Sequence, residues 1–471
     1  MRKILLFLIT FLFAFIPLYP KIPLTNVANT FVAIRIEDIL IALTVSLWAI
    51  YMIKTGKLEV FFKDKLNQAI LVFFFIGALS IFSANFLTHS VIPNLSFLHW
   101  ARRVEFMLLL PVVATVVNSK REFFWILGLL SLVVVTVNMY ALGQQYLDWP
   151  VISTTNSEFS KGLILRLSPG ARVNSTFAGH YDLAVFLAMA ITVSTALFFA
   201  VRKTLKPWIF LSLGLSMLIL IMTAARLSFV AAFVGVIAAL FFSKKKKYFL
   251  FILIVVAGIL LYPSQLRDRF ISTITVNLFG QGQRYEGRTE DQRLRSRINI
   301  PTLAIQTSSD SASTSSFIPS ASTATDITPG EPVDTTELGV YRSFSIRLNL
   351  EWPRAVSAFW KNPLLGTGYS SLGLATDNDF LRLLGEVGFL GTASFILIVI
   401  ESSKRILSLL KSEDRFIRFL SAGIFSMMIA FLVNGLFIDV FEASKVASLF
   451  WMMLGLNLAA FNFRGDYVKK F

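Results

Sequence analysis

Long uncharged apolar runs dominate this sequence and restrict what it can fold into. Twelve of them occur along the 471 residues, at 4–20, 39–53, 66–87, 106–119, 123–147, 183–201, 207–225, 227–243, 248–266, 387–400, 419–438 and 446–463. A helix that crosses a bilayer needs about 20 largely apolar residues, and soluble proteins do not concentrate apolar residues in such blocks. The sequence therefore predicts an all-α polytopic membrane protein with twelve transmembrane helices.

Basic residues collect in alternate loops between these runs. The six loops are 54–65, 120–121, 202–206, 244–247, 404–418 and 464–470. Because cytoplasmic loops carry an excess of Lys and Arg, all six are predicted to be cytoplasmic, as are both termini, in a protein of the plasma (inner) membrane. On this topology 16 lysines and 7 arginines face the cytoplasm, whereas 4 lysines and 17 arginines face the other side. Arginine binds phosphate and carboxylate in a bidentate manner, so this bias predicts an anionic substrate at the outer face.

The loop lengths divide the chain into three parts. Residues 1–263 form an N-terminal bundle of about nine helices, 264–382 a large extracytoplasmic loop, and 383–471 a C-terminal bundle of about three helices. We interpret the first run as a retained helix, because it ends in Pro17-Leu-Tyr-Pro20 and lacks a small-residue cleavage site. Within the large loop, 307–337 is rich in Ser and Thr with few apolar residues. This linker is expected to be disordered, because it has too little apolar surface to bury.

After the linker, the segment 347–360 regains a helical pattern. Its apolar residues recur three and four positions apart: Trp352, Ala355, Val356, Phe359 and Trp360. Charged residues, including Arg347 and Arg354, lie between them. The pattern predicts an amphipathic helix that lies in the outer interface of the membrane.

Two arginines stand where long apolar runs meet the outer water layer. Arg172 precedes the sixth span, and Arg226 lies in the short turn between the seventh and eighth spans. A desolvated arginine is costly unless it pairs with an anion, so both are candidates to hold a lipid-linked diphosphate. The alternative is an interfacial arginine whose guanidinium reaches out to water, or a structural ion pair.

A polar cluster, Thr376-Asp377-Asn378-Asp379, precedes the tenth span. A carboxylate at this place would serve as general base toward an acceptor hydroxyl. The alternative is helix capping by Asp377 or Asp379. Glu386 lies two to three turns further on and is either another acid or the buried partner of Arg226 or Arg382.

The composition excludes several classes of chemistry. The chain has no cysteine and three histidines, which rules out disulfides and thiolate sites and argues against a histidine-rich metal site. We therefore expect no metal and no cofactor. The net charge of +16 is split across two sides of a membrane, which fits anionic lipids and substrates and argues against nucleic acid.

Four stretches of the sequence resemble the O-antigen ligase and O-antigen polymerase superfamily of bacterial membrane proteins. They are Pro23 with Ile34-Arg-Ile-Glu-Asp38, Arg172 to Ala184, Met222-Thr-Ala-Ala-Arg226, and Arg347 through Gly391. The last stretch carries the fullest pattern, Arg…Trp…Ala…Asn-Pro-Leu-Leu-Gly-x-Gly…Asn…Leu…Glu-x-Gly-x-x-Gly. Family ligases have a histidine before the Asn of this pattern, where this chain has Asp377. That departure favours polymerases, in which the position varies.

The resemblance implies a metal-independent, inverting glycosyltransferase of cell-surface polysaccharide biosynthesis. Such an enzyme moves a glycan from an undecaprenyl-diphosphate-linked donor to a hydroxyl of a glycan or lipid-glycan acceptor. On this hypothesis Arg172 and Arg226 hold the diphosphate, and Arg347 or Arg354 assists. Asp377, oriented by Asn378, accepts the proton of the attacking hydroxyl. The resemblance leaves ligase and polymerase open.

Two other functions would also fit a basic polytopic protein. A flippase or other transporter of lipid-linked oligosaccharides would need ionisable groups deep within its spans. A non-catalytic scaffold of envelope assembly would need no outer cavity between Arg172, Arg226 and Asp377. The charges of this chain cluster at the predicted outer edge, which favours the enzyme.

Overall fold

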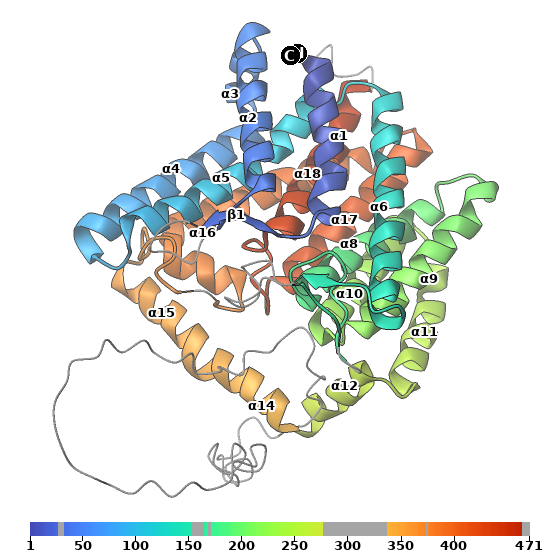
Figure 1. Cartoon of the computed structure of the whole chain (residues 1–471). Coiled ribbons are helices and arrows are strands. Elements are labelled where there is room, and N and C mark those ends of the chain that lie inside the picture. The colour runs from blue at the N-terminus through green and yellow to red at the C-terminus, as the bar shows by residue number, and fades with distance from the viewer. Residues whose placement is uncertain (27–32, 153–163, 168–170, 277–336, 374, 464–471) are drawn as a thin grey trace, which may run out of the picture.

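The protein is built almost entirely of helices (Figure 1). The computed structural model describes all residues except 27–32, 153–163, 168–170, 277–336, 374 and 464–471. The helices of the N-terminal part are α1 (Arg2–Leu18), α2 (Ile36–Lys54), α3 (Leu58–Lys63), α4 (Lys65–Ser83), α5 (Pro93–Val116), α6 (Lys120–Tyr146), α8 (His180–Phe198), α9 (Lys206–Met222), α10 (Arg226–Phe242) and α11 (Phe249–Leu261). The later helices are α12 (Gln265–Thr275), α14 (Glu337–Ile346), α15 (Trp352–Lys361), α16 (Asp379–Leu409), α17 (Arg415–Asn434) and α18 (Ser444–Ala459).

Short irregular turns and two small hairpins join these helices. The π-helices are η1 (Ala84–Thr88) and η5 (Arg347–Glu351), and the 3-10 turns are η2 (Lys203–Leu205), η3 (Lys246–Tyr248) and η6 (Ala460–Phe463). Strand β1 (Pro23–Asn26) pairs with β2 (Ala33–Arg35), and β3 (Val151–Ile152) pairs with β4 (Ile164–Leu165), both antiparallel.

Eight helices among the described residues are long and apolar enough to cross a membrane. A ninth is counted if α11 and α12, which meet at 88°, form one broken span. Each of the twelve apolar runs falls on a helix, but the prediction of twelve spanning helices is not confirmed. Helix α5 illustrates the difference: it begins at Pro93, well before the run at 106–119, and so includes Arg102, Arg103 and Glu105.

The core of the bundle is made by α5, α8, α17 and α18. All residues of α18 are buried, as expected of a helix that is apolar on every side. It packs closely on α5 at Gly455, where an added Cβ would stand 2.4 Å from the carbonyl oxygen of Leu110. Helix α17 packs against both α8 and α10.

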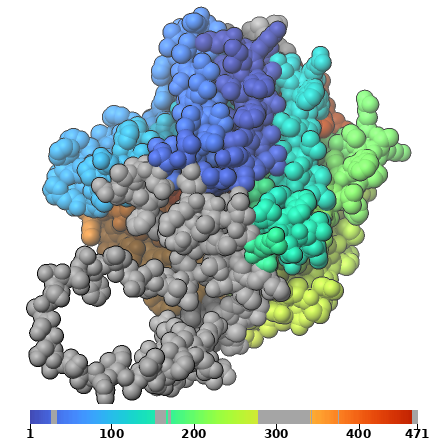
Figure 2. All heavy atoms as spheres, viewed as in Figure 1, coloured from blue at the N-terminus to red at the C-terminus, as the bar shows by residue number. Residues whose placement is uncertain are grey.

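The outer surface of the bundle is strongly apolar. Helices α2, α1 and α6 lie side by side on one face (Figure 2). Phe7 on α1 is 67% exposed, and large apolar side chains such as Leu43 and Leu132 are also exposed there. Apolar surface of this extent is unfavourable in water and is typical of a surface that contacts lipid. Together with the eight long apolar helices, it indicates a multi-pass membrane protein.

Three of the predicted cytoplasmic loops meet at one end of the bundle. Ion pairs join Lys120 to Asp414 (2.9 Å) and Arg405 to Asp64 (2.8 Å), which links three of the basic loops. Arg2 also lies at this end, because it donates to the carbonyl of Val116 (3.3 Å). Helices α12 and α14 lie at the opposite end (Figure 1).

The segment 362–368 is held against a break in α16. Gly388 has φ +64°, and an added Cβ there would stand 2.5 Å from the backbone of Leu364. The amides of Thr367 and Gly368 donate to the carbonyls of Gly385 and Glu386, both at 2.9 Å. The two halves of the Asn-Pro-Leu-Leu-Gly-x-Gly…Glu-x-Gly pattern are therefore one structural unit.

The amphipathic helix predicted over 347–360 is present in two parts, the π-helix η5 at Arg347–Glu351 and α15 at Trp352–Lys361. Ala355 and Ala358 are buried, while Val356 and Trp360 are 43% and 71% exposed. Its position in the membrane interface stays a prediction. The linker predicted to be disordered, 307–337, lies outside the described residues except for Glu337, the first residue of α14.

Candidate functional site

Arg226 begins α10 directly after a tight turn, as the sequence predicted. The turn needs a left-handed residue, Ala224, with φ +50°. The Nη1 of Arg226 donates to the carbonyl of Arg269 (3.2 Å) and to the hydroxyl of Thr273, both on α12. The positive charges of Arg269, Arg347 and Arg172 act on this guanidinium from three other segments.

Arg172 lies on the segment that leads into α8. Its Nη1 donates to Nε2 of His180 (2.6 Å), which requires that this ring nitrogen carry no proton. The backbone that carries Arg172 is fixed by Gln144, whose side chain accepts from the amide of Ser175 (2.7 Å) and donates to its carbonyl (3.0 Å). Lys445 holds the same segment, because its Nζ donates a hydrogen bond to the carbonyl of Thr176 (2.7 Å).

Arg269 is a member of this site that the sequence analysis missed. It lies on α12, is 6% exposed, and donates to the carbonyl of Ala224 in the turn before Arg226 (3.2 Å). No sequence motif surrounds it, and the sequence predicts that 264–382 is an extracytoplasmic loop. The available signal was the helical spacing of Leu266, Arg269 and Ser272, the three buried residues of α12.

Arg347 forms an ion pair with Asp377, with 2.6 Å between Nη2 and Oδ2. Arg347 is mostly buried, and Asp377 is about one third exposed. The charges of Arg269, Arg172, Arg347 and Asp377 all act on the side chain of Tyr181, on α8. We call the following four residues the arginine cluster: Arg172, Arg226, Arg269 and Arg347.

Asp377 stands on a turn that Asp439 holds in place. Asp377 has φ +49°, which is unusual for a residue other than glycine. The carboxylate of Asp439 accepts from the amides of Thr376 (2.8 Å), Asp377 (3.2 Å) and Asn378 (3.2 Å). Burial raises the pKa of Asp377 above its ordinary value of 3.8, and the Arg347 charge opposes that rise only in part.

The prediction that Asp377 or Asp379 caps α16 is wrong. Asn378 is the cap, and its Oδ1 accepts from the amides of Phe380 and Leu381. Asp379 is buried in the first turn of the helix, where it accepts from the amides of Val440 (2.9 Å) and Phe441 (3.3 Å). Asp377 therefore does not cap α16, and its carboxylate pairs with Arg347.

Glu386 and Arg354 do not contact the arginine cluster in the part of the chain that the structure describes. Glu386 pairs with Arg382 (3.3 Å), one of the two partners considered for it, and not with Arg226. Arg354 donates to the carbonyl of Leu372 (3.2 Å), at the side of the site. Arg382 also binds Asp439 (2.7 Å) and so links this second charge network to the turn of Asp377.

The comparison with known families agrees with this arrangement. Residues 211–396 match the family described as O-antigen ligase. The match covers less than half of the chain, and this segment is similar to O-antigen ligase domains. The match supports the O-antigen ligase and polymerase superfamily, a glycosyltransferase-like activity in polysaccharide biosynthesis, and a lipid-linked glycan and a glycan acceptor as substrates in general. A search of curated proteins found no match.

The matched segment contains most of the candidate residues. Arg226, Arg269, Arg347 and Asp377 all lie within 211–396, whereas Arg172 lies before it. The part of the chain before the matched segment therefore supplies one of the four guanidinium groups. The transporter and scaffold alternatives receive no support from this match.

No group of three or more His, Cys, Asp or Glu side chains arranged to hold a metal ion occurs among the described residues. Of the acidic side chains near the cluster, Asp377 pairs with Arg347, and Asp439 accepts from backbone amides of the Asp377 turn.

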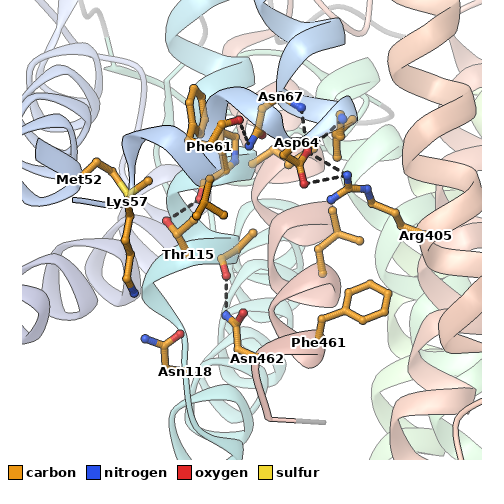
Figure 3. Close-up of a pocket in the computed structure, with 16 residues that line it drawn as sticks. Met52, Lys57, Phe61, Asp64, Asn67, Thr115, Asn118, Arg405, Phe461 and Asn462 are labelled. Atoms are coloured by element: carbon orange, nitrogen blue, oxygen red, sulfur yellow. Dashed lines mark hydrogen bonds and ion pairs between the residues drawn. The ribbon is translucent and has the colours of Figure 1, made fainter. Parts of the chain in front are cut away.

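A separate cavity of about 290 Å³ lies at the other end of the bundle (Figure 3). Its lining combines apolar side chains such as Met52 and Phe461 with Lys57, Asn118 and the Asp64–Arg405 ion pair. None of the arginine cluster lines it. Since α18 begins near Asp439 and ends at this cavity, the length of the bundle separates the two.

Proposed function

We propose that this protein is a membrane glycosyltransferase that moves a glycan from an undecaprenyl-diphosphate-type donor to an acceptor hydroxyl. The observation that carries the proposal is the convergence of the arginine cluster from four segments of the chain. Like charges repel, so such a cluster is costly unless an anion neutralises it. The headgroup common to lipid-linked glycan donors is a diphosphate, which suits planar guanidinium groups.

The donor headgroup is held by Arg172 and Arg226, with Arg269 and Arg347 completing its surroundings. As the bond between the anomeric carbon and the diphosphate oxygen breaks, negative charge grows on the leaving group. Fixed guanidinium groups stabilise this charge in the transition state without a metal ion. No cofactor is required for this displacement.

Asp377 is the proton acceptor on the acceptor side of the site, with Arg347 between it and the donor. Its raised pKa makes it a better base than an ordinary aspartate. Asn378 and Asp439 fix the turn that carries it. Attack from the side opposite the leaving diphosphate inverts the configuration at the anomeric carbon.

The site faces the extracytoplasmic side of the plasma membrane. The basic loops lie at the opposite end of the bundle, and the positive-inside rule places that end, with both termini, in the cytoplasm. The membrane itself supplies the lipid that anchors the donor.

Transfer from a lipid-diphosphate oligosaccharide by the purified full-length protein tests the proposal. Arg226→Ala is expected to lower kcat by roughly 10²–10³-fold, the usual effect of removing one donor to a developing anion. Arg267→Ala is the matched control: it lies on α12 near Arg269 but pairs at the surface with Asp268. Full transfer by Arg226→Ala would contradict the scheme. A ladder of product lengths identifies a polymerase, and one transferred unit or chain on a different acceptor identifies a ligase.

A further inference from the structure

Arg172 is held by a histidine, His180, which begins α8. The Nη1 of Arg172 lies 2.6 Å from Nε2 of His180, although the two residues are separated in the chain. The segment between them folds back through Ser175, which has φ +51°. Gln144 fixes this turn, because its side chain binds both the amide and the carbonyl of Ser175. The contact between Arg172 and His180 is therefore built into the fold.

The direction of this hydrogen bond determines the chemical form of the imidazole. A guanidinium group only donates, so Nε2 of His180 is the acceptor and carries no proton. The neutral ring then carries its proton on Nδ1. A protonated imidazole has N–H groups at both nitrogens, and two donors would face each other across 2.6 Å. The contact is therefore compatible with the neutral form alone.

The position of His180 in α8 favours the same neutral form. His180 is the first residue of the helix, and Gly179 before it has no side chain that could cap the helix. The N-terminus of a helix carries partial positive charge, which opposes the formation of an imidazolium. The ring packs against that of Tyr181, with 4.1 Å between the ring centroids.

The groups around this ring add no negative charge within the described part of the chain. Those that carry charge or titrate are Arg172 on the segment before α8, Arg269 on α12 and Tyr181 on α8 itself. Asp182, the nearest carboxylate along α8, pairs with Lys21 (3.5 Å). Protonation of His180 would therefore place a positive charge beside other positive charges.

A neutral acceptor suits an arginine that binds an anion. An imidazole fixes the plane of a guanidinium but contributes no negative charge, whereas a carboxylate in its place would cancel positive charge. Arg347 has such a carboxylate partner in Asp377 (2.6 Å). Arg226 is held by neutral acceptors, the carbonyl of Arg269 (3.2 Å) and the hydroxyl of Thr273. The two arginines assigned to the donor diphosphate therefore share this kind of partner.

We propose that His180 is a positioning residue for the donor: its neutral imidazole holds Arg172 in the orientation that binds the diphosphate, and its protonation releases Arg172. The inference rests on the proposed function and deepens it. Histidine changes its charge between about pH 5 and 8, whereas the two phosphates of a lipid-diphosphate sugar keep one charge each in this range. Donor affinity therefore falls on acidification through His180, independently of the base Asp377.

Binding of an undecaprenyl-diphosphate-linked disaccharide to the purified full-length protein tests this role. Between about pH 7.5 and pH 5.5 the Kd of the wild type is expected to rise about tenfold, the usual effect of losing one hydrogen bond to a charged group. His180→Gln places an oxygen acceptor near the position of Nε2 and does not titrate, so its Kd is expected to stay near the wild-type value at both pH values.

Two further variants separate positioning from general damage. His180→Phe keeps a ring against Tyr181 but removes the acceptor. Its Kd is expected to be raised about tenfold at both pH values, with kcat at saturating donor within about threefold of the wild type. His89→Asn is the matched control, because His89 is exposed and asparagine tolerates its φ of +45°. This variant keeps the wild-type pH dependence.

The outcomes distinguish this inference from the proposed function. Tighter donor binding by the wild type at the lower pH, or an unchanged Kd in His180→Phe, would overturn the role of His180. If Arg172→Ala binds the donor as the wild type does, the proposed function fails at Arg172. If Arg172→Ala loses donor affinity and His180→Phe does not, the proposed function stands and the positioning role fails.

Nitrogen NMR of histidine-labelled protein examines the imidazole without any donor. The chain has three histidines, so the spectra of His89→Asn and His180→Gln identify the signals of His180. A ring protonated at Nδ1 and unprotonated at Nε2 is expected at neutral pH, and Arg172→Ala is expected to shift both signals. A protonated Nε2 at neutral pH, or signals that do not respond to Arg172→Ala, would refute the contact. Gel filtration confirms that each variant is folded.

Discussion

Asp439→Asn is the substitution that most directly tests how this site is held. The two oxygens of Asp439 accept three backbone amides of the Asp377 turn and bind the guanidinium of Arg382 at 2.7 Å. The asparagine side chain has almost the same shape as that of aspartate, but it carries no charge. Its NH2 group would also face a backbone N–H group, so two donors would meet where Asp439 accepts a hydrogen bond. The substitution therefore removes an interaction with little change in packing.

The size of the effect follows from the burial of the partners. Arg382 is 1% exposed and Asp439 is 12% exposed. Breaking a buried ion pair by removing one partner typically costs 3–5 kcal/mol. Arg382 keeps Glu386 at 3.3 Å and Glu442 at 3.7 Å, so the lower end of this range applies. We expect the free energy of unfolding to fall by about 3 kcal/mol.

The same substitution is expected to reduce catalysis more than binding. The left-handed backbone of Asp377 costs about 1–2 kcal/mol and persists because Asp439 binds its amide. Release of the turn displaces Asp377, and a displacement of about 1 Å lowers rates by about 100-fold. Donor affinity is expected to stay within about threefold, because the arginine cluster is held by other segments.

Chemical unfolding, donor binding and single-turnover transfer measure these three quantities on one preparation. Asp268→Asn is the control: its pair with Arg267 is exposed, so we expect a loss below about 1 kcal/mol and unchanged transfer. Unchanged stability and kcat in Asp439→Asn would refute the argument that Asp439 holds the turn. Equal losses of donor binding and transfer would show that the Arg382 network supports the whole site instead.

Three further predictions concern pH, backbone and metal. Transfer is expected to fall as the pH falls through the raised pKa of Asp377, because the base must be ionised; a kcat–pH profile with its acid limb at or below 3.8 would contradict this. Gly388→Ala should abolish folded protein on gel filtration, since a Cβ at φ +64° meets the Leu364 backbone at 2.5 Å, whereas Gly214→Ala, with nothing within 4 Å, should not. Transfer measured after treatment with EDTA should stay within about twofold of the untreated rate, because guanidinium groups supply the counter-charge; restoration of a lost activity by Mg²⁺ would count against the scheme.

The sequence was sufficient for features with a local cause. Apolar runs located the helices, because burial in lipid demands them, and the helical spacing after the linker located α15. The short turn before Arg226 was also predicted, since two apolar runs flank it closely. The charge distribution also grouped three loops, 54–65, 120–121 and 404–418, which meet at one end of the bundle.

The sequence was insufficient where contacts between distant segments decide the result. Arg103 was absent from the predictions, yet it pairs with Glu442, 339 positions later, inside the bundle. No sequence motif marks Arg269. Its place in the site follows from the packing of α12 against the turn before Arg226, where Arg269 donates to the carbonyl of Ala224. The role of Asp377 depends on its left-handed backbone. Asp439, in the segment between α17 and α18, fixes this backbone by accepting a hydrogen bond from the amide of Asp377.

The two charge networks at the end of the bundle opposite the basic loops differ in composition. Arg103 and Arg382 each have carboxylate partners in Glu386, Asp439 and Glu442, so the protein itself compensates both guanidinium groups of this network. The arginine cluster instead brings guanidinium groups from four segments to one site, and Arg347 pairs there with Asp377. Planar guanidinium groups bind phosphate oxygens in a bidentate manner. A diphosphate that joins a lipid to a sugar carries one charge on each phosphate, so the proposed donor offers two anionic groups to the cluster.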